Sequence, residues 1–226
     1  MIRVLQYQRE VELATQAIQM QGLPTHLTVQ KNWDQWLLAQ CLMTVDRRSP
    51  IIDLGCGDGC TLEFLAALGF QNLTGVDLEI PAQASDRPYQ LYAADMHTTP
   101  FPDHTFAVAV SVSVIEHGAN LKAFFQEADR LLRSHGLLFI TTDYWQQQIP
   151  IDPAIKPFNL PWKIFSYSEI ETMITLAAVH GFRLITAQPI PECIETTVDW
   201  HAQQYTFIAL GFQKSTSPRE HNRRSS

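Results

Sequence analysis

The stretch IIDLGCGDG, residues 51–59, decides the fold. It begins with a short, mostly apolar run that is typical of a strand buried on both faces of a sheet. Gly55, Gly57 and Gly59 then stand at alternate positions, which allows a tight turn and lets a ligand lie close to the backbone. Because an ordinary strand-to-helix turn does not need three alternating glycines, the pattern predicts a ligand-binding turn at the start of an α/β domain.

On both sides of this turn, short apolar runs alternate with helical stretches. Strands are expected at residues 51–54, 73–76, 89–93, 106–112, 137–141, 182–187 and 205–212, and helices at 61–68, 120–133 and 166–180. Continuous apolar runs separated by helices predict a parallel sheet covered on both faces, which is a doubly wound α/β fold. No crossover helix separates the last two strands, so we expect them to pair antiparallel.

The two ends of the chain differ from this pattern. Residues 3–20 and 29–43 carry apolar side chains close to helical spacing, so residues 1–46 are predicted to form a helical extension. Residues 47–213 form the predicted α/β domain, and the polar tail 214–226 is predicted to be disordered. Ser166/Glu169 and Ser168/Glu171 form two overlapping capping boxes before the last helix.

The composition excludes several classes of protein. The 226 residues carry 16 Lys and Arg against 23 Asp and Glu, a formal net charge of −7. This acidic balance argues against nucleic acid or an anionic membrane as the main partner. No run of about 18 apolar residues exists and the N-terminus lacks the apolar segment of a signal peptide, so we expect a cytoplasmic protein. Its four cysteines lack zinc-ligand spacing, so we expect free thiols and no metal.

The spacing of the glycines and carboxylates indicates the kind of ligand. A dinucleotide-binding turn has the pattern G-x-G-x-x-G, whereas this turn has G-x-G-x-G between Asp53 and Asp58. Two carboxylates would repel a pyrophosphate but suit an ammonium or sulfonium group. Asp77 closes the next strand, where a carboxylate commonly holds a ribose diol, and Asp95 closes the third.

Four segments together resemble the class I S-adenosylmethionine-dependent methyltransferases of the small-molecule type. They are IIDLGCGDG, GVDL (residues 75–78), AADMHTTPFPDHTFAVAVSVSVIEH (93–117) and EADRLLRSHGLLFITT (127–142), and the resemblance covers about residues 50–212. It implies a Rossmann-like sheet of seven strands whose last strand is antiparallel, and it implies S-adenosylmethionine as the cofactor.

The same resemblance implies which residues hold the cofactor. The glycines would lie beside its methionine part, Asp53 would orient its amino group, and Asp77 would bind the ribose hydroxyls. Asp95 would accept a hydrogen bond from the adenine amine. The full set of implied cofactor-binding residues is Asp53, Gly55, Cys56, Gly57, Gly59, Asp77, Leu78, Asp95, Met96 and Ser111.

Candidates for the acceptor side follow the fourth and fifth strands. Ile115-Glu116-His117 resembles the Glu-His pair of small-molecule members, so His117 is a candidate general base for an acceptor hydroxyl. The alternative is a histidine that packs or caps the following helix. Asp143, Tyr144 and Trp145 begin a long loop at the carboxyl end of a strand, where ligands bind in doubly wound folds.

The N-terminal extension is a place where family members often build a cap over the acceptor. It contains KNWDQW, residues 31–36, in which polar and aromatic residues are dense. Trp33 is therefore a candidate acceptor-binding residue, and plain packing is the alternative.

These observations lead to one main hypothesis and two alternatives. The main one is methyl transfer from S-adenosylmethionine to a small-molecule acceptor, with O-methylation slightly favoured. A protein that binds the cofactor without turnover is the first alternative, and a nicotinamide-dependent oxidoreductase is the second. The residues do not identify the acceptor or the oligomeric state.

Overall fold

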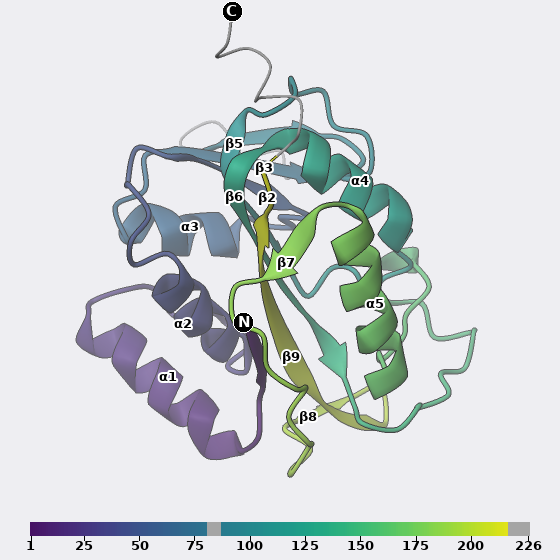
Figure 1. The fold of residues 1–226 in the computed structure, drawn as a ribbon. Coiled ribbons are helices and arrows are strands. Elements are labelled where there is room, and N and C mark those ends of the chain that lie inside the picture. The colour runs from purple at the N-terminus through teal and green to yellow at the C-terminus, as the bar shows by residue number, and fades with distance from the viewer. Residues whose placement is uncertain (81–86, 217–226) are drawn as a thin grey trace, which may run out of the picture.

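The computed structural model describes residues 1–80 and 87–216, which form one mixed sheet with helices on both faces (Figure 1). The strands are β1 (Ile2–Val4), β2 (Pro50–Leu54), β3 (Asn72–Asp77), β4 (Gln90–Ala93), β5 (Phe106–Val112), β6 (Leu132–Tyr144), β7 (Phe182–Leu184), β8 (Val198–Trp200) and β9 (Gln203–Lys214). The α-helices are α1 (Gln8–Met20), α2 (Lys31–Cys41), α3 (Cys60–Ala67), α4 (Leu121–Leu131) and α5 (Tyr167–Val179).

The strand order is β1-β9-β6-β5-β2-β3-β4, with β7 and β8 also paired to β9. Strands β2 to β6 run parallel to one another. Strand β9 runs antiparallel to β6 from Leu137–Gln213 to Tyr144–Thr206, and β7 is antiparallel to β9. The prediction of a doubly wound, Rossmann-like α/β fold with an antiparallel last strand is confirmed.

The described sheet has nine strands rather than the seven expected. Strands β2 to β7 and β9 correspond to the predicted seven, and β1 and β8 are additional. The prediction of a helix from Arg3 is wrong at its start, because Ile2 and Val4 are buried while Arg3 is exposed, which is the period of a strand. Strand β1 pairs with β9 beside β7, and so covers backbone that β7 leaves unpaired.

The two faces of the sheet carry different helices. Figure 1 shows α1, α2 and α3 on one side and α4 and α5 on the other. Buried apolar residues form a core cluster on each side, one of which includes residues of α1, α2 and α3 and the other residues of α4 and α5. The N-terminal helices therefore belong to the same layer as α3, and the role of residues 1–46 as a cap stays a prediction.

Helix α5 begins as its capping box predicts. The backbone N–H of Ser166 donates a 2.8 Å hydrogen bond to Oε2 of Glu169, and the Ser166 hydroxyl also bonds to this carboxylate. At the other end of the domain, Lys214 was expected to open a disordered tail, but it ends β9. Its buried ammonium donates to the Leu132 carbonyl at 2.8 Å. Residues 217–226 of the expected tail lie outside the described residues.

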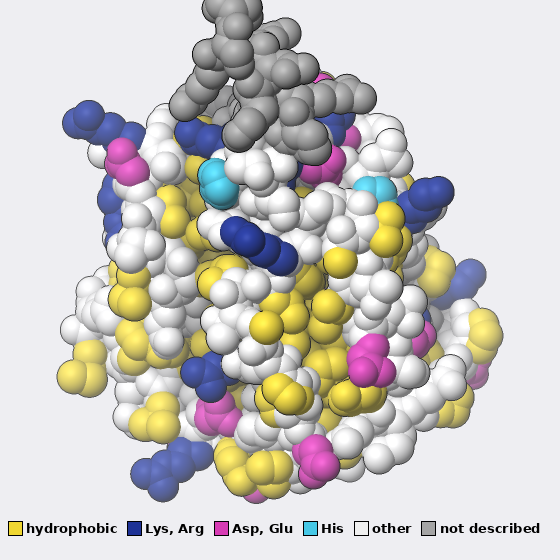
Figure 2. Space-filling model, in the orientation of Figure 1, with side chains coloured by type: hydrophobic (Ala, Val, Ile, Leu, Met, Phe, Trp, Pro, Cys, Tyr) yellow, Lys and Arg dark blue, Asp and Glu magenta, His cyan; other side chains and the backbone are white. Residues whose placement is uncertain are grey.

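On the face shown in Figure 2, basic side chains are scattered among acidic and apolar ones rather than gathered in one patch. Among the described residues, no helix combines the length and the apolar character that a membrane crossing requires. Within the same residues, no group of three or more His, Cys, Asp or Glu side chains is arranged to hold a metal ion. The four cysteines are free thiols, as expected.

Candidate active site

The glycine turn after β2 is fastened to the end of β3. The backbone N–H of Gly57 donates a 2.8 Å hydrogen bond to Oδ2 of Asp77. The N–H groups of Gly55 and Cys56 both donate to the Val76 carbonyl, at 2.9 and 3.0 Å. Because β2 and β3 are parallel neighbours, their carboxyl ends meet at one edge of the sheet. The turn and the Asp77 carboxylate are therefore neighbours in the fold, although they are far apart in the sequence.

Glycine is required at each of these three positions for a different structural reason. All have a positive φ, which L side chains adopt only with strain. A Cβ at Gly55 would lie 2.3 Å from Val114, and a Cβ at Gly59 would lie 2.6 Å from the Tyr89 hydroxyl. A Cβ at Gly57 would have no atom within 4 Å. Gly57 therefore borders open space in which a ligand can lie, whereas Gly55 admits the chain segment that follows β5.

Asp53 is a buried carboxylate with an unused oxygen. Its side chain is 1% exposed, and Oδ1 has no hydrogen-bond partner. Burial, helped by the negative charges of Asp77 and Asp58, raises the pKa of Asp53 to about 8. A buried acceptor without a donor is costly unless a ligand supplies one. The ammonium of a bound amino-acid group would supply that donor and a positive charge, so this oxygen fits the methionine part of S-adenosylmethionine.

Two further predicted residues are already engaged within the protein. The hydroxyl of Ser111, which is fully buried, donates a 3.0 Å hydrogen bond to the Leu54 carbonyl and so joins β5 to β2. Asp95 accepts hydrogen bonds from the backbone N–H of His97 at 2.9 Å and contacts its ring Nδ1 at 2.6 Å. Both contacts use Oδ1 of Asp95, so they leave Oδ2 for another donor. The contact of Asp95 with adenine stays a prediction.

The remaining predicted cofactor residues differ in exposure. The side chain of Leu78 is 60% exposed at the end of β3, beside Asp77. Met96 is half-buried and packs against the core cluster on the α4 and α5 side. Cys56 is buried within the glycine turn, and burial raises the pKa of its thiol. Cys56 is thus an unreactive thiol that contributes its backbone to the turn.

The segment that follows β5 brings the Glu-His pair against the turn. Val114 packs on Gly55, and Glu116 is buried two residues later. Oε2 of Glu116 accepts a 2.9 Å hydrogen bond from the Thr142 hydroxyl on β6. Burial, and then the negative charge of Asp143, raises the pKa of Glu116. Glu116 therefore connects the segment after β5 to β6 through this hydrogen bond.

His117 is half-buried, and its Nδ1 is buried without a hydrogen-bond partner. Its ring stands edge-on to Phe158 and Trp200, with ring centroids 5.2 and 6.5 Å apart. Burial and the positive charge of Lys31 lower the pKa of His117 to about 4. The ring is therefore neutral at physiological pH and has a nitrogen free to accept a proton.

Alternation along β6 separates the residues predicted at its end. Asp143 is buried, and its Oδ2 accepts a 2.8 Å hydrogen bond from Nε1 of Trp162. Successive strand residues point to opposite faces, so Tyr144 packs in the core cluster on the α4 and α5 side. Tyr144 therefore lies on the opposite face of the sheet from the Asp143 side chain, and its contact with an acceptor stays a prediction. Trp145 is half-buried on the α1 to α3 side.

Helix α2 contributes two side chains that the sequence did not single out. Nζ of Lys31 donates a hydrogen bond to the Ser113 hydroxyl at the end of β5, and lies 3.7 Å from Oδ2 of the fully buried Asp34. Trp33, the residue expected to contact the acceptor, is 3% exposed and packs in the core. The polar residues within KNWDQW were the available signal, because polar residues on a buried helix need partners.

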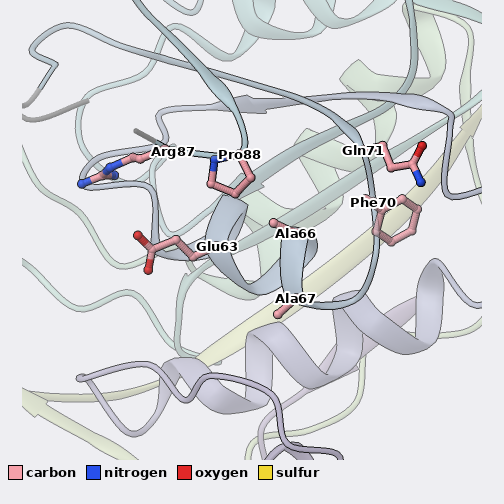
Figure 3. Close-up of a pocket in the computed structure, with 7 residues that line it drawn as sticks. All are labelled: Glu63, Ala66, Ala67, Phe70, Gln71, Arg87 and Pro88. Carbon is pink, nitrogen blue, oxygen red and sulfur yellow. The ribbon is translucent and has the colours of Figure 1, made fainter. Parts of the chain in front are cut away.

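A surface hollow lies along the exposed side of α3 (Figure 3). Its lining is Glu63, Ala66, Ala67, Phe70, Gln71, Arg87 and Pro88, and none of these is a predicted site residue. Arg87 connects it to the glycine turn, since its guanidinium donates to the Asp58 carbonyl and, at 2.8 Å, to the Tyr89 hydroxyl. Arg87 therefore helps to hold the turn, and the lining of the hollow includes neither Gly57 nor Asp53.

The structure thus brings together three features expected of a cofactor site: a turn bordered by open space, a carboxylate at the next strand end and an unpaired buried carboxylate. Residues 52–140 match the family described as "Methyltransferase domain". These residues form a class I S-adenosylmethionine-dependent methyltransferase domain. The predictions of this family and of its cofactor, S-adenosylmethionine, are confirmed at this level, and the nicotinamide alternative is set aside.

The curated relatives of this methyltransferase domain match it over part of their length. The chain is 31% identical over 117 residues to a "Probable S-adenosylmethionine-dependent methyltransferase" from Mycobacterium tuberculosis, covering 48% of this chain and 41% of the relative. It is 27% identical over 112 residues to a "Ubiquinone biosynthesis O-methyltransferase" from Rhizobium etli, covering 43% and 45%. The chain thus spans less than half the length of these relatives.

Solved structures share the fold over most of this chain. The [4+2]-cyclase SpnF aligns with a TM-score of 0.65 at 13% identity, covering 92% of this chain and 97% of that one. Geranyl diphosphate C-methyltransferase from Streptomyces coelicolor aligns with a TM-score of 0.62 at 17% identity, covering 85% and 84%. At these identities the likeness shows the fold alone.

Proposed function

We propose that this protein transfers a methyl group from S-adenosylmethionine to a hydroxyl group of a small molecule. The observation that carries the hydroxyl assignment is the neutral, unpartnered Nδ1 of His117 just beyond β5. A hydroxyl must lose its proton as it accepts a methyl group, and a positioned base speeds such a step by about 10²–10⁴-fold. The fold family and its cofactor site supply the methyl-transfer part of the proposal.

The residues of the site have separate roles in this reaction. Asp53 and Asp77 bind the amino-acid and ribose parts of the cofactor, and Gly57 leaves space for it. The bound cofactor supplies an activated sulfonium methyl. Val114, packed on Gly55, holds the segment with His117 against the turn. Positioning of this kind accounts for about 7–11 kcal/mol of a barrier, so alignment is the protein's main contribution.

The experiment is an acceptor screen. Purified protein is incubated with S-adenosylmethionine and a small-molecule extract, and both S-adenosylhomocysteine and compounds heavier by one methylene are measured. The proposal expects both products, with the new methyl group on oxygen. Binding of the cofactor in calorimetry without either product would support the alternative of a cofactor-binding protein without turnover. A methyl group found on nitrogen or carbon would contradict the hydroxyl assignment.

A further inference from the structure

The ammonium group of Lys31 lies in a cage built from three separate parts of the fold. It donates a hydrogen bond to the Ser113 hydroxyl, lies 3.7 Å from Oδ2 of Asp34 and lies 4.0 Å from the centre of the Phe207 ring. We call Asp34, Ser113 and Phe207 the cation cage. A carboxylate, a hydroxyl and an aromatic face together are the groups that recognise an ammonium ion.

Lys31 does not fully satisfy the hydrogen-bonding capacity of the Asp34 carboxylate in the cation cage. Asp34 is fully buried, and neither of its carboxylate oxygens has a partner with good hydrogen-bond geometry, although Lys31 and the Thr141 hydroxyl act to lower its pKa. Its closest ammonium, on Lys31, is 3.7 Å away, which is an ion pair but longer than a hydrogen bond. Burial raises the pKa of Asp34 to about 7 even though Lys31 acts to lower it. The Asp34 carboxylate therefore has capacity for a donor that reaches further than Lys31 does.

The charge around the cation cage is also unbalanced. Glu116 and Asp143 are both buried, and the positive charge of Lys31 acts on both as well as on Asp34. Three buried carboxyl groups thus share this lysine. Buried carboxylates are stable only when they are paired or protonated. The surroundings of the cage favour a cation and disfavour an anionic ligand.

Ser113, a member of the cation cage, has a strained backbone and lies close to the glycine turn. Ser113 has a φ of 53°, a conformation that residues other than glycine adopt at a cost. It follows β5 directly, and its backbone N–H is held by the Thr141 carbonyl at 3.0 Å. Its hydroxyl is directed to Lys31, one residue before the Val114 contact with the glycine turn. The cation cage is therefore next to the cofactor site.

We propose that the acceptor is held through an ammonium group, which takes the place of the Lys31 ammonium in the cation cage. This inference rests on the proposed methyl transfer to a small molecule and names the chemical class of that molecule, a hydroxyl-bearing amine. The exchange replaces one cation by another, so the buried carboxylates are never left without a counter-charge. Lys31 can leave because it is the first residue of α2 and its side chain is 18% exposed.

The test removes the lysine side chain and supplies its missing part in solution. Lys31→Ala deletes three carbons and the ammonium, which is the size of n-propylammonium. In the presence of S-adenosylhomocysteine, saturating n-propylammonium should raise the Tm of Lys31→Ala by about 5–10 °C. The same concentrations of 1-propanol and potassium chloride should leave the Tm unchanged, because one lacks the charge and the other the alkyl chain.

Two variants serve as matched controls. Lys31→Met keeps the length of the side chain without its charge, so it fills the space and should not respond to n-propylammonium. Lys31→Ala with Asp34→Asn keeps the space but loses the carboxylate, and should need at least about tenfold more n-propylammonium for the same Tm shift. If Lys31→Ala does not fold alone, recovery of folded protein by refolding with n-propylammonium rather than 1-propanol is the readout.

The proposal is overturned if Lys31→Ala responds equally to n-propylammonium and 1-propanol, or to neither. It is also overturned if amine-bearing acceptors and their N-acetylated counterparts are methylated by the wild type with equal kcat/KM. The Tm experiment requires no turnover, so it separates this inference from the proposed function. Ammonium binding without methyl transfer would leave the cation cage standing and contradict the methyltransferase reaction.

Discussion

The backbone N–H of Gly57 donates a 2.8 Å hydrogen bond to Oδ2 of Asp77, and this bond joins the glycine turn to the end of β3. Asp77 therefore has two functions in the expected site. It holds the turn in shape, and we propose that it also presents a carboxylate to the ribose of the cofactor. A substitution at Asp77 is expected to affect both.

Asp77→Ala should weaken S-adenosylmethionine binding by at least about tenfold, because hydrogen bonds to a charged group contribute about 1.5–3 kcal/mol each. Asp77→Asn is the matched control, since its side-chain oxygen can still accept from Gly57 while the charge is lost. We expect its affinity to lie between those of the wild type and Asp77→Ala. Calorimetry measures the three affinities, and circular dichroism verifies the fold. Equal affinity of all three proteins would remove Asp77 from the site.

Gly57→Val should abolish cofactor binding while the protein stays folded. The new side chain would enter the open space beside the turn, and a φ of 53° strains a β-branched residue. Gly22→Val is the control for strain alone, because Gly22 also has a positive φ of 68° and open space around its Cβ position. Calorimetry should show normal binding for Gly22→Val. Loss of binding in both variants would attribute the effect to strain.

Cofactor binding should release a proton from Asp53. In the free protein its pKa is raised to about 8, so the carboxyl is largely protonated at pH 7. A bound ammonium and sulfonium favour the ionised form and lower this pKa. The affinity for S-adenosylmethionine should therefore fall as pH decreases below about 8, by up to about tenfold per pH unit.

Proton release is measured by calorimetry in buffers with different enthalpies of ionisation. At pH 7 the apparent binding enthalpy of the wild type should depend on the buffer, and that of Asp53→Asn should not. The asparagine cannot ionise and keeps the size of the side chain. A wild-type enthalpy that is independent of the buffer would show that Asp53 is already ionised before the cofactor binds.

Local patterns in the sequence predicted the cofactor half of the site better than the acceptor half. The glycine turn and Asp77 lie directly at strand ends, so strand order alone brings them together. Lys31 and Asp34 reach the end of β5 from α2, and no periodicity predicts how that helix packs. The sequence also did not show which of the neighbours Asp143 and Tyr144 faces the α4 and α5 side, because alternation along β6 decides this.

The extra strand β1 was missed for a similar reason. Three residues are too few to show an alternating pattern, and β1 exists because a length of the β9 edge is free to accept it. The helical spacing that begins inside this segment was extended too far toward the N-terminus. Strand length and edge pairing are properties of the whole sheet, so they become visible only in the structure.

Removal of residues 1–46 should unfold the domain rather than only stop turnover. Strand β1 pairs with β9, and the buried residues of α1 and α2 share a core cluster with those of α3 and the sheet. Loss of this cover would expose buried side chains such as Leu38 and Trp33 to water. Size-exclusion chromatography and circular dichroism of a chain that starts at Arg47 should show aggregation or unfolding. A soluble, folded truncation that binds S-adenosylmethionine and lacks only turnover would support the simple cap.

His117→Ala should lower kcat by about 10²–10⁴-fold and leave the affinity for S-adenosylmethionine unchanged, because the histidine is proposed to accept the acceptor's proton. His117→Gln keeps a similar size without basicity and should be nearly as slow. His180→Gln, at the end of α5, is the control for replacing a histidine away from the site. A His117→Ala enzyme that keeps most of its kcat but melts at a lower temperature would show a structural histidine.

The pH dependence of the rate is a second, independent test of His117 as the base. Its pKa of about 4 in the folded protein means that the ring stays neutral and able to accept a proton well below pH 6.5. With both substrates saturating, the wild-type kcat should therefore remain high at pH 5.5 and fall only as pH approaches about 4. Lys31→Met, which removes the nearby positive charge, should move this fall to higher pH.

The same shift predicts how His117 affects stability. Its pKa is lower in the folded chain than the value of 6.5 for an exposed histidine, so the unfolded chain binds more protons between pH 6.5 and 4. The contribution of the neutral ring to stability is complete above pH 6.5 and is lost as pH falls toward 4. The Tm of His117→Ala should therefore decrease less over this range than that of the wild type, and calorimetric scans at each pH test this. An equal decrease in both proteins would show that His117 titrates with an ordinary pKa, and the acid limb of kcat at saturating substrates should then appear near pH 6.5.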